Sequence, residues 1–220
     1  MSVTSFFRQE VLEKVESSIN GQIQVVRTAG RYKIMCGGLI QTGGVLRDIW
    51  RKGLKRISDN QFPISNVLIL GLGGGTVARL VAKQWPQAQI VGVELDPAMI
   101  TLGKKYFDLD RLSQLKIIQA DAFEWVKNQK DKFDLILVDM YLGELLPEKS
   151  EQEEFLQDLR SLLTKPGKVI FNRLFYDQHQ QTAQAFVKRV EKELGGTELV
   201  RAWSNLLVTA TYEIDRKRRE

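Results

Sequence analysis

The chain has 220 residues, a length typical of one domain with at most a small appendage. Hydrophobic residues make up 43% and charged residues 27%, which is enough for a globular core, and no apolar segment is long enough to span a bilayer. The single cysteine, Cys36, and the single histidine, His179, exclude an intramolecular disulfide and a zinc site made of these residues. The opening residues lack the basic start and the apolar stretch of a secretory signal. We therefore expect a cytoplasmic protein with no metal and no membrane association.

The formal net charge is +5, and much of the excess lies in two basic segments. They consist of Arg47, Arg51, Lys52, Lys55 and Arg56, and of the tail Arg216–Arg219. We interpret them as a solvated helix face and a frayed terminus. The alternative is a footprint for nucleic acid or an acidic protein, but no aromatic residues are interleaved with these charges. Nucleic acid is therefore not an expected partner.

The opening of the chain predicts a small unit over residues 1–60. Apolar residues at helical spacing predict an amphipathic helix over residues 4–19, which an Asn-Gly pair ends. Two short extended runs, 22–28 and 31–36, predict a β-hairpin. Two glycine pairs then precede a basic helix predicted over residues 45–57. We expect this unit to act as a lid or as a dimer element, so a homodimer is an expected assembly.

Residues 61–220 predict a larger unit in which strands and helices alternate. The predicted strands cover residues 67–70, 89–94, 115–119, 133–139, 168–172, 198–203 and 206–212. The alternation predicts right-handed crossovers and a parallel sheet with helices on both faces. The last two strands are so close in sequence that they must form an antiparallel hairpin. The predicted fold is therefore α/β, with a seven-stranded, mostly parallel, doubly wound sheet of the Rossmann-like type.

Two of the predicted helices begin with explicit capping signals. Asp96 followed by Pro97 is a typical helix start, with the aspartate as cap and the proline in the first turn. The run Ser150-Glu151-Gln152-Glu153 predicts a capping box for a helix that ends near residue 163.

A glycine-rich loop joins the first strand of the larger unit to its helix. Gly71, Gly73 and Gly75 fit the G-x-G-x-G pattern of S-adenosylmethionine sites, and Gly74 lies between them. A dinucleotide fold needs a small third residue where this chain has Thr76, and a P-loop is excluded because no Gly-Lys-Ser/Thr follows. Glycines let the backbone approach a ligand, and the following helix offers free N–H groups to an anion.

Acidic side chains follow the next three strands. Glu94 ends the second strand 19 residues after Gly75, where an acid can accept hydrogen bonds from ribose hydroxyls; the adjacent Leu95 is included in the predicted site. Asp121 follows the third strand, where an acid can accept from an adenine amino group while the N–H of Ala122 donates to the ring, although Asp121 also fits a plain helix cap. Asp139 ends the fourth strand. Polar ends of neighbouring parallel strands meet at one edge, so we expect one ligand crevice there.

From residue 66 to about residue 172 the chain resembles the class I S-adenosylmethionine-dependent transferases, and within them the spermidine synthase-like group. The similar segments are VLILGLGGGTVARL, IVGVELDPAMITLGKKYF, IIQADAFEWV and FDLILVDMY. CGGLIQTGG in the opening unit resembles a segment of those synthases in which Gln41 matches a ligand-contacting glutamine. The resemblance implies a methyltransferase-type sheet. It also implies that the glycine loop, Glu94, Asp121 and Asp139 bind cofactor or act near the reacting centre.

The chain departs from the synthase pattern at several acids. The synthases carry an aspartate at the place of Gly74, a glutamate at Leu80 and a second aspartate at Leu142. A Tyr-His-Glu run is replaced by Trp50-Arg51-Lys52. The missing acids are those that would bind a polyamine cation and the free amine of decarboxylated S-adenosylmethionine. We therefore do not expect putrescine to be the substrate.

The favoured hypothesis is a methyltransferase that uses S-adenosylmethionine and a small-molecule acceptor. Asp139 is predicted to orient or deprotonate the nucleophile, and Tyr141 to line the acceptor pocket or simply to pack. Residues 142–149 are predicted to form a lid that excludes water. The alternatives are aminopropyl transfer from decarboxylated S-adenosylmethionine, and a cofactor-binding module without chemistry. We interpret His179 as an exposed residue and Cys36 as a small core residue.

Overall fold

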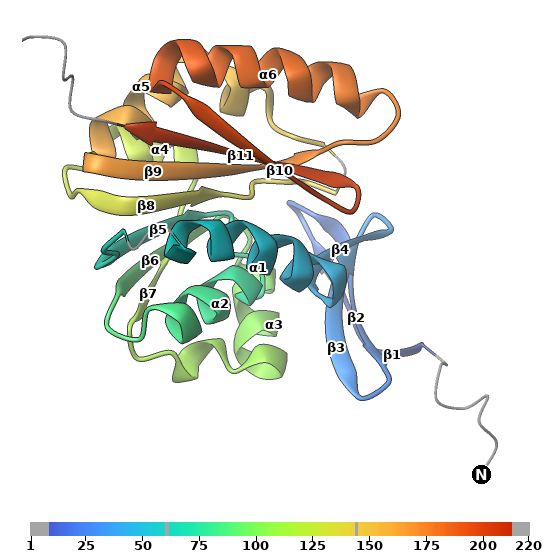
Figure 1. The fold of residues 1–220 in the computed structure, drawn as a ribbon. Helices are drawn as coiled ribbons and strands as arrows, with labels where there is room; N and C mark the ends of the chain where they lie inside the picture. The colour runs from blue at the N-terminus through green and yellow to red at the C-terminus, as the bar shows by residue number, and fades with distance from the viewer. Residues whose placement is uncertain (1–8, 60–61, 144, 213–220) are drawn as a thin grey trace, which may run out of the picture.

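A computed structural model describes residues 9–59, 62–143 and 145–212 of the chain (Figure 1). A seven-stranded sheet has the order β10-β11-β9-β8-β5-β6-β7. β11 is antiparallel to both of its neighbours, and the other adjacent strands from β9 to β7 are parallel. The strands are β5 (Asn66–Leu70), β6 (Gln89–Glu94), β7 (Leu115–Gln119), β8 (Phe133–Val138), β9 (Leu163–Leu174), β10 (Thr197–Ala202) and β11 (Asn205–Tyr212). The predicted seven-stranded, mostly parallel sheet and its antiparallel closing hairpin are confirmed.

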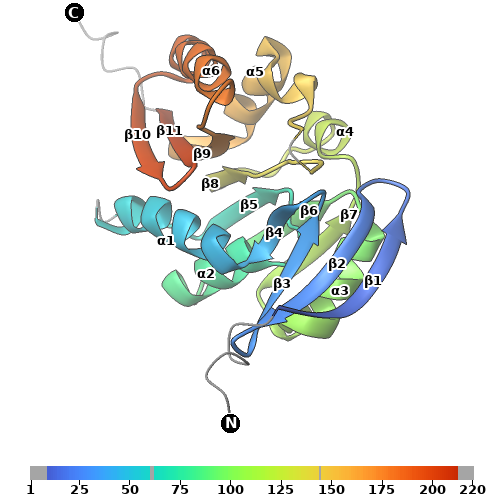
Figure 2. The ribbon, with the colours of Figure 1, turned by 90° about the vertical axis from the view of Figure 1, so that its right-hand side faces the viewer.

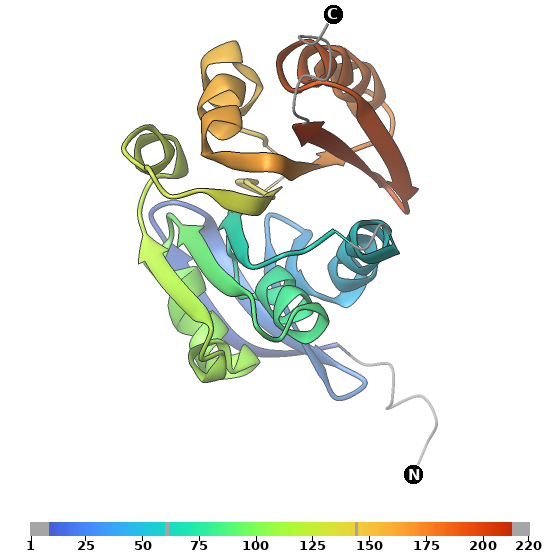
Figure 3. The same cartoon turned by 60° about the vertical axis from the view of Figure 1, so that its left-hand side comes forward.

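Helices cover both faces of this sheet, as Figures 1 and 3 show. On one face lie α1 (Gly44–Asp59), α2 (Thr76–Gln84) and α3 (Pro97–Phe107); on the other lie α4 (Ala122–Lys127), α5 (Glu153–Leu162) and α6 (His179–Leu194). Two 3₁₀ turns, η2 (Leu109–Arg111) and η3 (Glu148–Glu151), complete the connections. None of the helices in the described segments is long and apolar enough to cross a membrane.

Strand β5 explains why the apolar run in the sequence is continuous. Val67 and Ile69 pack in the core beneath α1 and α2, whereas Leu68 and Leu70 pack in the core beneath α5 and α6. All four side chains have no exposed surface. A strand that alternates between two buried faces needs an apolar residue at every position, and this pattern places β5 at the centre of the sheet.

A separate four-stranded antiparallel sheet, ordered β1-β2-β3-β4, packs against α3 (Figure 2). Its strands are β1 (Glu10–Ser17), β2 (Gly21–Thr28), β3 (Arg31–Cys36) and β4 (Leu39–Gly43). The β2–β3 hairpin and the basic helix α1 agree with the sequence prediction. β4, between the two glycine pairs, was not predicted.

The helix predicted over residues 4–19 is wrong for its described part, because residues 10–17 form strand β1. Residues 1–8 lie outside the described residues. Leu12 and Val15 contact the core under this sheet, and the pairing of β1 with β2 is irregular between Val11 and Glu13. That irregularity changes the alternation of side chains, so the apolar spacing imitates a helical period. Pairing with β2 across a tight turn decides the conformation.

The predicted capping box at residues 150–153 is also wrong. Ser150 lies in η3, is buried, and donates its hydroxyl to the Pro147 carbonyl at 2.6 Å. Helix α5 begins after Gln152, with no side-chain cap. The hydroxyl is used by the preceding turn, and so it does not cap the helix.

Candidate active site

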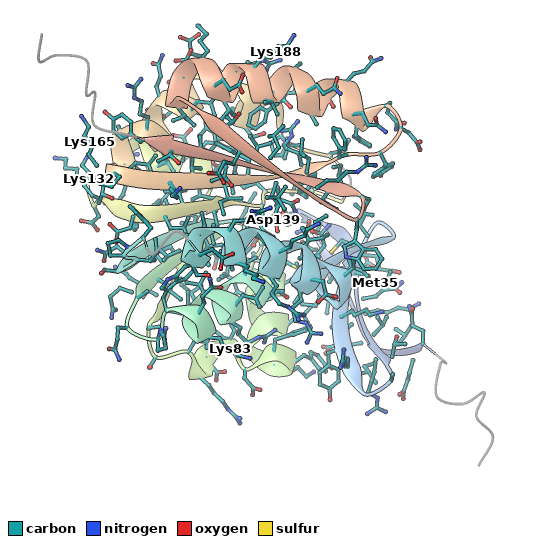
Figure 4. All side chains as sticks on the ribbon, in the orientation of Figure 1. Met35, Lys83, Lys132, Asp139, Lys165 and Lys188 are labelled. Carbon is teal, nitrogen blue, oxygen red and sulfur yellow. The ribbon has the colours of Figure 1, made fainter. Side chains whose placement is uncertain are left out.

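A cavity of about 310 Å³ lies at the carboxyl ends of the parallel strands β5, β6, β7 and β8. Its lining includes every predicted site residue except Gly74 and Gly75: Gln41, Gly71, Gly73, Glu94, Leu95, Asp121, Ala122, Asp139 and Tyr141. Gly74 and Gly75 belong to the same loop but are buried beneath it. Figure 4 shows Asp139 near the middle of the molecule. The tertiary structure therefore brings residues from five separate chain segments into one site.

The glycine loop adopts a backbone that only glycine accepts readily. Gly71, Gly73 and Gly75 have φ angles of 83°, 53° and 88°. A Cβ atom on Gly71 would lie 2.3 Å from the carbonyl oxygen of Asp139, so the loop also needs glycine for close packing. Helix α2 begins directly after Gly75 with no side-chain cap, which leaves its first N–H groups without a side-chain partner.

Glu94 is hydrogen-bonded to the glycine loop. Its Oε2 accepts the Gly73 N–H at 2.7 Å, and its Oε1 accepts the Asp96 N–H at 2.9 Å. Burial raises the pKa of Glu94, and these backbone donors lower it in part. Each carboxylate oxygen keeps a lone pair, so hydroxyl donors in the cavity have acceptors available.

Asp121 caps helix α4 and lines the cavity at the same time. Its Oδ1 accepts the N–H groups of Phe123 at 2.8 Å and Glu124 at 3.2 Å. The helix-cap interpretation of Asp121 is therefore what the geometry shows, and the capping bonds fix where its second oxygen lies. Ala122, the first residue of α4, lines the cavity beside it.

Asp139 is held by two neutral donors. Its Oδ2 accepts the indole N–H of Trp50 at 2.7 Å, and its Oδ1 accepts the side-chain amide of Asn172 at 2.8 Å. Burial raises the pKa of Asp139, while the bonds from Asn172 and Trp50 lower it. The carboxylate therefore has a fixed orientation and lines the cavity.

Tyr141 uses its hydroxyl in the framework. The hydroxyl accepts the Leu174 N–H at 2.8 Å and donates to the Asn172 carbonyl at 3.2 Å, so it anchors the segment after β8 to β9. Burial raises the pKa of Tyr141. These bonds favour a packing role for Tyr141 over proton transfer.

The four-stranded sheet closes the cavity through β4. Thr42 accepts the Gly74 N–H at 2.8 Å, and Thr76 accepts the Gly43 N–H at 2.8 Å. The side-chain amide of Gln41 donates to the Gly143 carbonyl at 3.3 Å, which joins β4 to the predicted lid. The small unit is therefore fixed to the glycine loop by neutral hydrogen bonds.

The charge of the cavity is opposite to that of the chain. Its acidic lining residues are Glu94, Asp121 and Asp139, and none of the described residues that line it is a lysine, arginine or histidine. The same described part of the chain contains no group of three or more His, Cys, Asp or Glu side chains that could hold a metal ion. An apolar cavity lined by carboxylates, with no basic side chain among its described lining residues, suits a cationic ligand.

Sequence reasoning missed three residues around Asp139. Trp50 had no predicted site role, Asn172 ends a predicted strand, and Asn205 lies in the predicted link between the last two strands. Both asparagines are buried, and a polar side chain at a buried position was the signal that could have found them. His179 is half-buried and not exposed as predicted; its ring meets that of Tyr176 edge to face, with centroids 4.8 Å apart, and it does not line the cavity. Cys36 is buried, and burial raises its pKa to about 12.

Two relatives each match about half of the chain. Over 123 residues the chain is 31% identical to the polyamine aminopropyltransferase of Vibrio vulnificus, a match that covers 53% of this chain and 41% of that protein. Over 126 residues it is 29% identical to the eEF1A lysine and N-terminal methyltransferase homolog of Drosophila melanogaster, covering 53% of this chain and 19% of that protein. The chain thus corresponds to less than half the length of these relatives.

Solved structures share the fold over nearly the whole chain. A probable spermidine synthase from Corynebacterium glutamicum superposes with a TM-score of 0.79 at 18% identity, covering 92% of this chain and 80% of that one. Human methyltransferase-like protein 13 in complex with SAH gives a TM-score of 0.67 at 18% identity, covering 81% and 86%. At these identities the similarity shows the fold alone. Residues 57–212 match the spermine/spermidine synthase domain family, and the chain belongs to that family.

Proposed function

We propose that this chain is a transferase that binds S-adenosylmethionine and transfers its methyl group to a small-molecule nucleophile. The cavity supports a sulfonium ligand, because three carboxylates and no basic side chain line it among the described residues of a chain of net charge +5. Human methyltransferase-like protein 13, which has the same fold, was solved with SAH. The name of the Drosophila relative, a lysine and N-terminal methyltransferase homolog, supports methyl transfer to nitrogen.

The close packing around Gly74 favours methyl transfer over aminopropyl transfer. A Cβ atom there would lie 2.7 Å from Ile34 Cδ1 and 2.8 Å from Thr42 Cγ2, so the position has no room for a carboxylate. Aminopropyl transfer brings ammonium groups of both reactants into the site in addition to the sulfonium. With Glu94 bonded to the glycine loop and Asp121 capping α4, Asp139 is left as the acid for an acceptor. The methyl donor carries a carboxylate that offsets the charge of its own amine. Methyl transfer therefore needs fewer acidic side chains from the cavity than aminopropyl transfer.

In the proposed mechanism the protein supplies binding, alignment and a proton acceptor. Glu94 holds the ribose hydroxyls, and Asp121 with the Ala122 N–H holds the adenine edge. Asp139 orients the nucleophile and takes its proton as it attacks. The cofactor, when bound, supplies a methyl group already activated by its sulfonium. Alignment of the two reactants contributes about 7–11 kcal/mol in well-oriented reactions.

Aminopropyl transfer is the second candidate, and the Vibrio vulnificus relative named for that activity favours it. It requires a substrate whose ammonium groups are satisfied without an acid at position 74. The cytoplasmic location and the homodimer stay predictions from the sequence.

Isothermal titration calorimetry with S-adenosylmethionine and then with its decarboxylated form tests the proposal. We expect tighter binding of the intact cofactor by about tenfold or more, equivalent to one charged hydrogen bond. Glu94→Ala should weaken binding by about tenfold or more, whereas Asp110→Ala, which removes an exposed acid away from the cavity, should leave it unchanged.

Each other outcome of the titration has a definite meaning. Preference for the decarboxylated form would replace methyl transfer by aminopropyl transfer. Binding of neither form would leave a fold without cofactor chemistry and would contradict the proposal. Binding of the intact form without transfer to any amine would point to the non-catalytic alternative.

A further inference from the structure

Asp139 is the end point of a chain of hydrogen bonds that crosses three elements. Asn205 on β11 donates its side-chain amide to Asn172 Oδ1 at 2.8 Å, and Asn172 on β9 donates its own amide to Asp139 Oδ1 at 2.8 Å. From the opposite side, Trp50 on α1 donates to Asp139 Oδ2 at 2.7 Å. We infer that Trp50, Asn172 and Asn205 are positioning residues that hold Asp139 as a one-directional proton acceptor facing the cavity.

The direction of these hydrogen bonds follows from which of the side chains can donate and which can accept. An indole N–H is a donor only, so Trp50 cannot accept a proton from Asp139. An asparagine amide offers both functions, but the amide of Asn205 occupies the oxygen of Asn172 and thereby turns the NH₂ group of Asn172 toward Asp139. Both donors therefore point at the carboxylate, which favours its ionised form.

Burial makes this arrangement rigid. Trp50, Asn172 and Asn205 are 0%, 3% and 6% exposed. β11 pairs with β9 along its whole length, so the two asparagines sit on adjacent strands of one ladder. Buried polar side chains that are all satisfied by one another specify a single arrangement. Asn172 and Asn205 also line the cavity, so they hold Asp139 at the cavity wall.

The arrangement leaves the cavity side of Asp139 as the place where a proton can arrive. Each carboxylate oxygen already accepts one hydrogen bond from the framework and keeps further acceptor capacity. The other titratable side chains that line the cavity are Glu94, Asp121, Tyr141 and Tyr176, and none of them brings positive charge. A protonated nucleophile in the cavity thus meets an unneutralised carboxylate with fixed geometry. This consequence for catalysis rests on the proposed function, whereas the hydrogen-bond chain itself does not.

The indole N–H resonance of Trp50 reports on the ionisation of Asp139 through their hydrogen bond, and no substrate is needed. The protein has four tryptophans, so ¹H–¹⁵N spectra contain four indole signals, and Trp50→Phe assigns the one that matters. We expect that signal to shift with pH as Asp139 titrates, and to lose this shift in Asp139→Asn. We expect its midpoint to move to higher pH in Asn205→Ala, because an unoriented Asn172 donates less well to the carboxylate.

Trp203→Phe is the matched control, since Trp203 is 71% exposed and takes no part in the hydrogen bonds that lead to Asp139. It should leave the Trp50 midpoint unchanged. Asn205→Ser, which leaves a smaller void than Asn205→Ala, serves as the second variant if Asn205→Ala does not give a dispersed spectrum. A Trp50 signal that does not titrate, or that titrates equally in Asp139→Asn, would overturn the inference. An unchanged midpoint in the Asn205 variant would remove Asn205 from it. Failure of cofactor binding in the calorimetric test leaves these outcomes unaffected.

Discussion

The two sheets of this protein build opposite sides of one cavity by different means. The seven-stranded sheet is covered by helices on both faces, and its central strand is buried at every position that follows Asn66. The four-stranded sheet packs one face on α3 and leaves side chains such as Val11 and Tyr32 exposed by 44% and 38%. The larger sheet supplies the carboxylates of the cavity, and the smaller unit supplies neutral groups that close it.

This difference shows that the larger sheet fixes the positions of the acidic side chains. The acids stand at strand ends of a sheet whose core is independent of the smaller sheet. The smaller sheet is held on by hydrogen bonds at that edge: Thr42 accepts one, and Gly43, Ser17 and Asn20 each donate one. Changes in the larger sheet should therefore unfold the protein, whereas changes at the junction should loosen only the smaller sheet.

Gly71→Ala should have the largest effect. The substitution places a Cβ atom 2.3 Å from the Asp139 carbonyl at a φ of 83°, so strain and overlap add. We expect a loss of about 4 kcal/mol in the free energy of unfolding, measured by urea denaturation. Gly196→Ala, which has no atoms within 4 Å of its Cβ position, should change it by less than about 0.5 kcal/mol. Equal effects of the two substitutions would contradict this packing argument.

Asp96→Ala should separate the two sheets. Asp96 is 1% exposed and accepts from Ser17 at 2.5 Å, Asn20 at 2.7 Å and the Ala98 N–H at 2.8 Å. We expect a loss of about 3 kcal/mol and faster amide exchange in β1 and β2 than in β5. The exposed Asp131→Ala is the control. Uniformly faster exchange in both sheets would show that they unfold as one unit.

Gly74→Ala should cost less, about 1–2 kcal/mol. The nearest atoms are the flexible end of Ile34 at 2.7 Å and the methyl group of Thr42 at 2.8 Å, so part of the overlap can relax. Thr42→Ser in the same chain removes that methyl group and should recover part of the loss. If the double variant is no more stable than Gly74→Ala, Thr42 does not limit the space at this position.

Glu94→Gln should give the smallest effect, seen as a dependence on pH. Because burial raises the pKa of Glu94 in the folded state, its protonated form favours folding. That contribution is fully present below the unfolded pKa and is lost as pH rises through the folded pKa. The thermal midpoint of the wild type relative to Glu94→Gln should therefore rise as pH falls from neutral to acid in ligand-free protein. A relative midpoint that falls instead would assign the opposite shift to Glu94.

The sequence by itself determined the larger sheet, because its signals are local. Continuous apolar runs define buried strands, the glycine pattern defines the loop after β5, and acids at strand ends must meet at one edge of a parallel sheet. These rules located all three acidic residues that line the cavity, and Asp96 with Pro97 marked the start of α3 as observed.

Tertiary structure decided the rest. Leu12 and Val15 have a spacing that suits a helix, but pairing with β2 makes their segment a strand. Ser150 has the pattern of a cap, but the turn at Pro147 takes its hydroxyl. Trp50 and Asn172 bond to Asp139, and Asn205 bonds to Asn172, only because α1, β9 and β11 pack together, and their separation along the chain hides these contacts. Hydrogen bonds between distant segments leave no periodic trace in a sequence, and so only the folded chain reveals them.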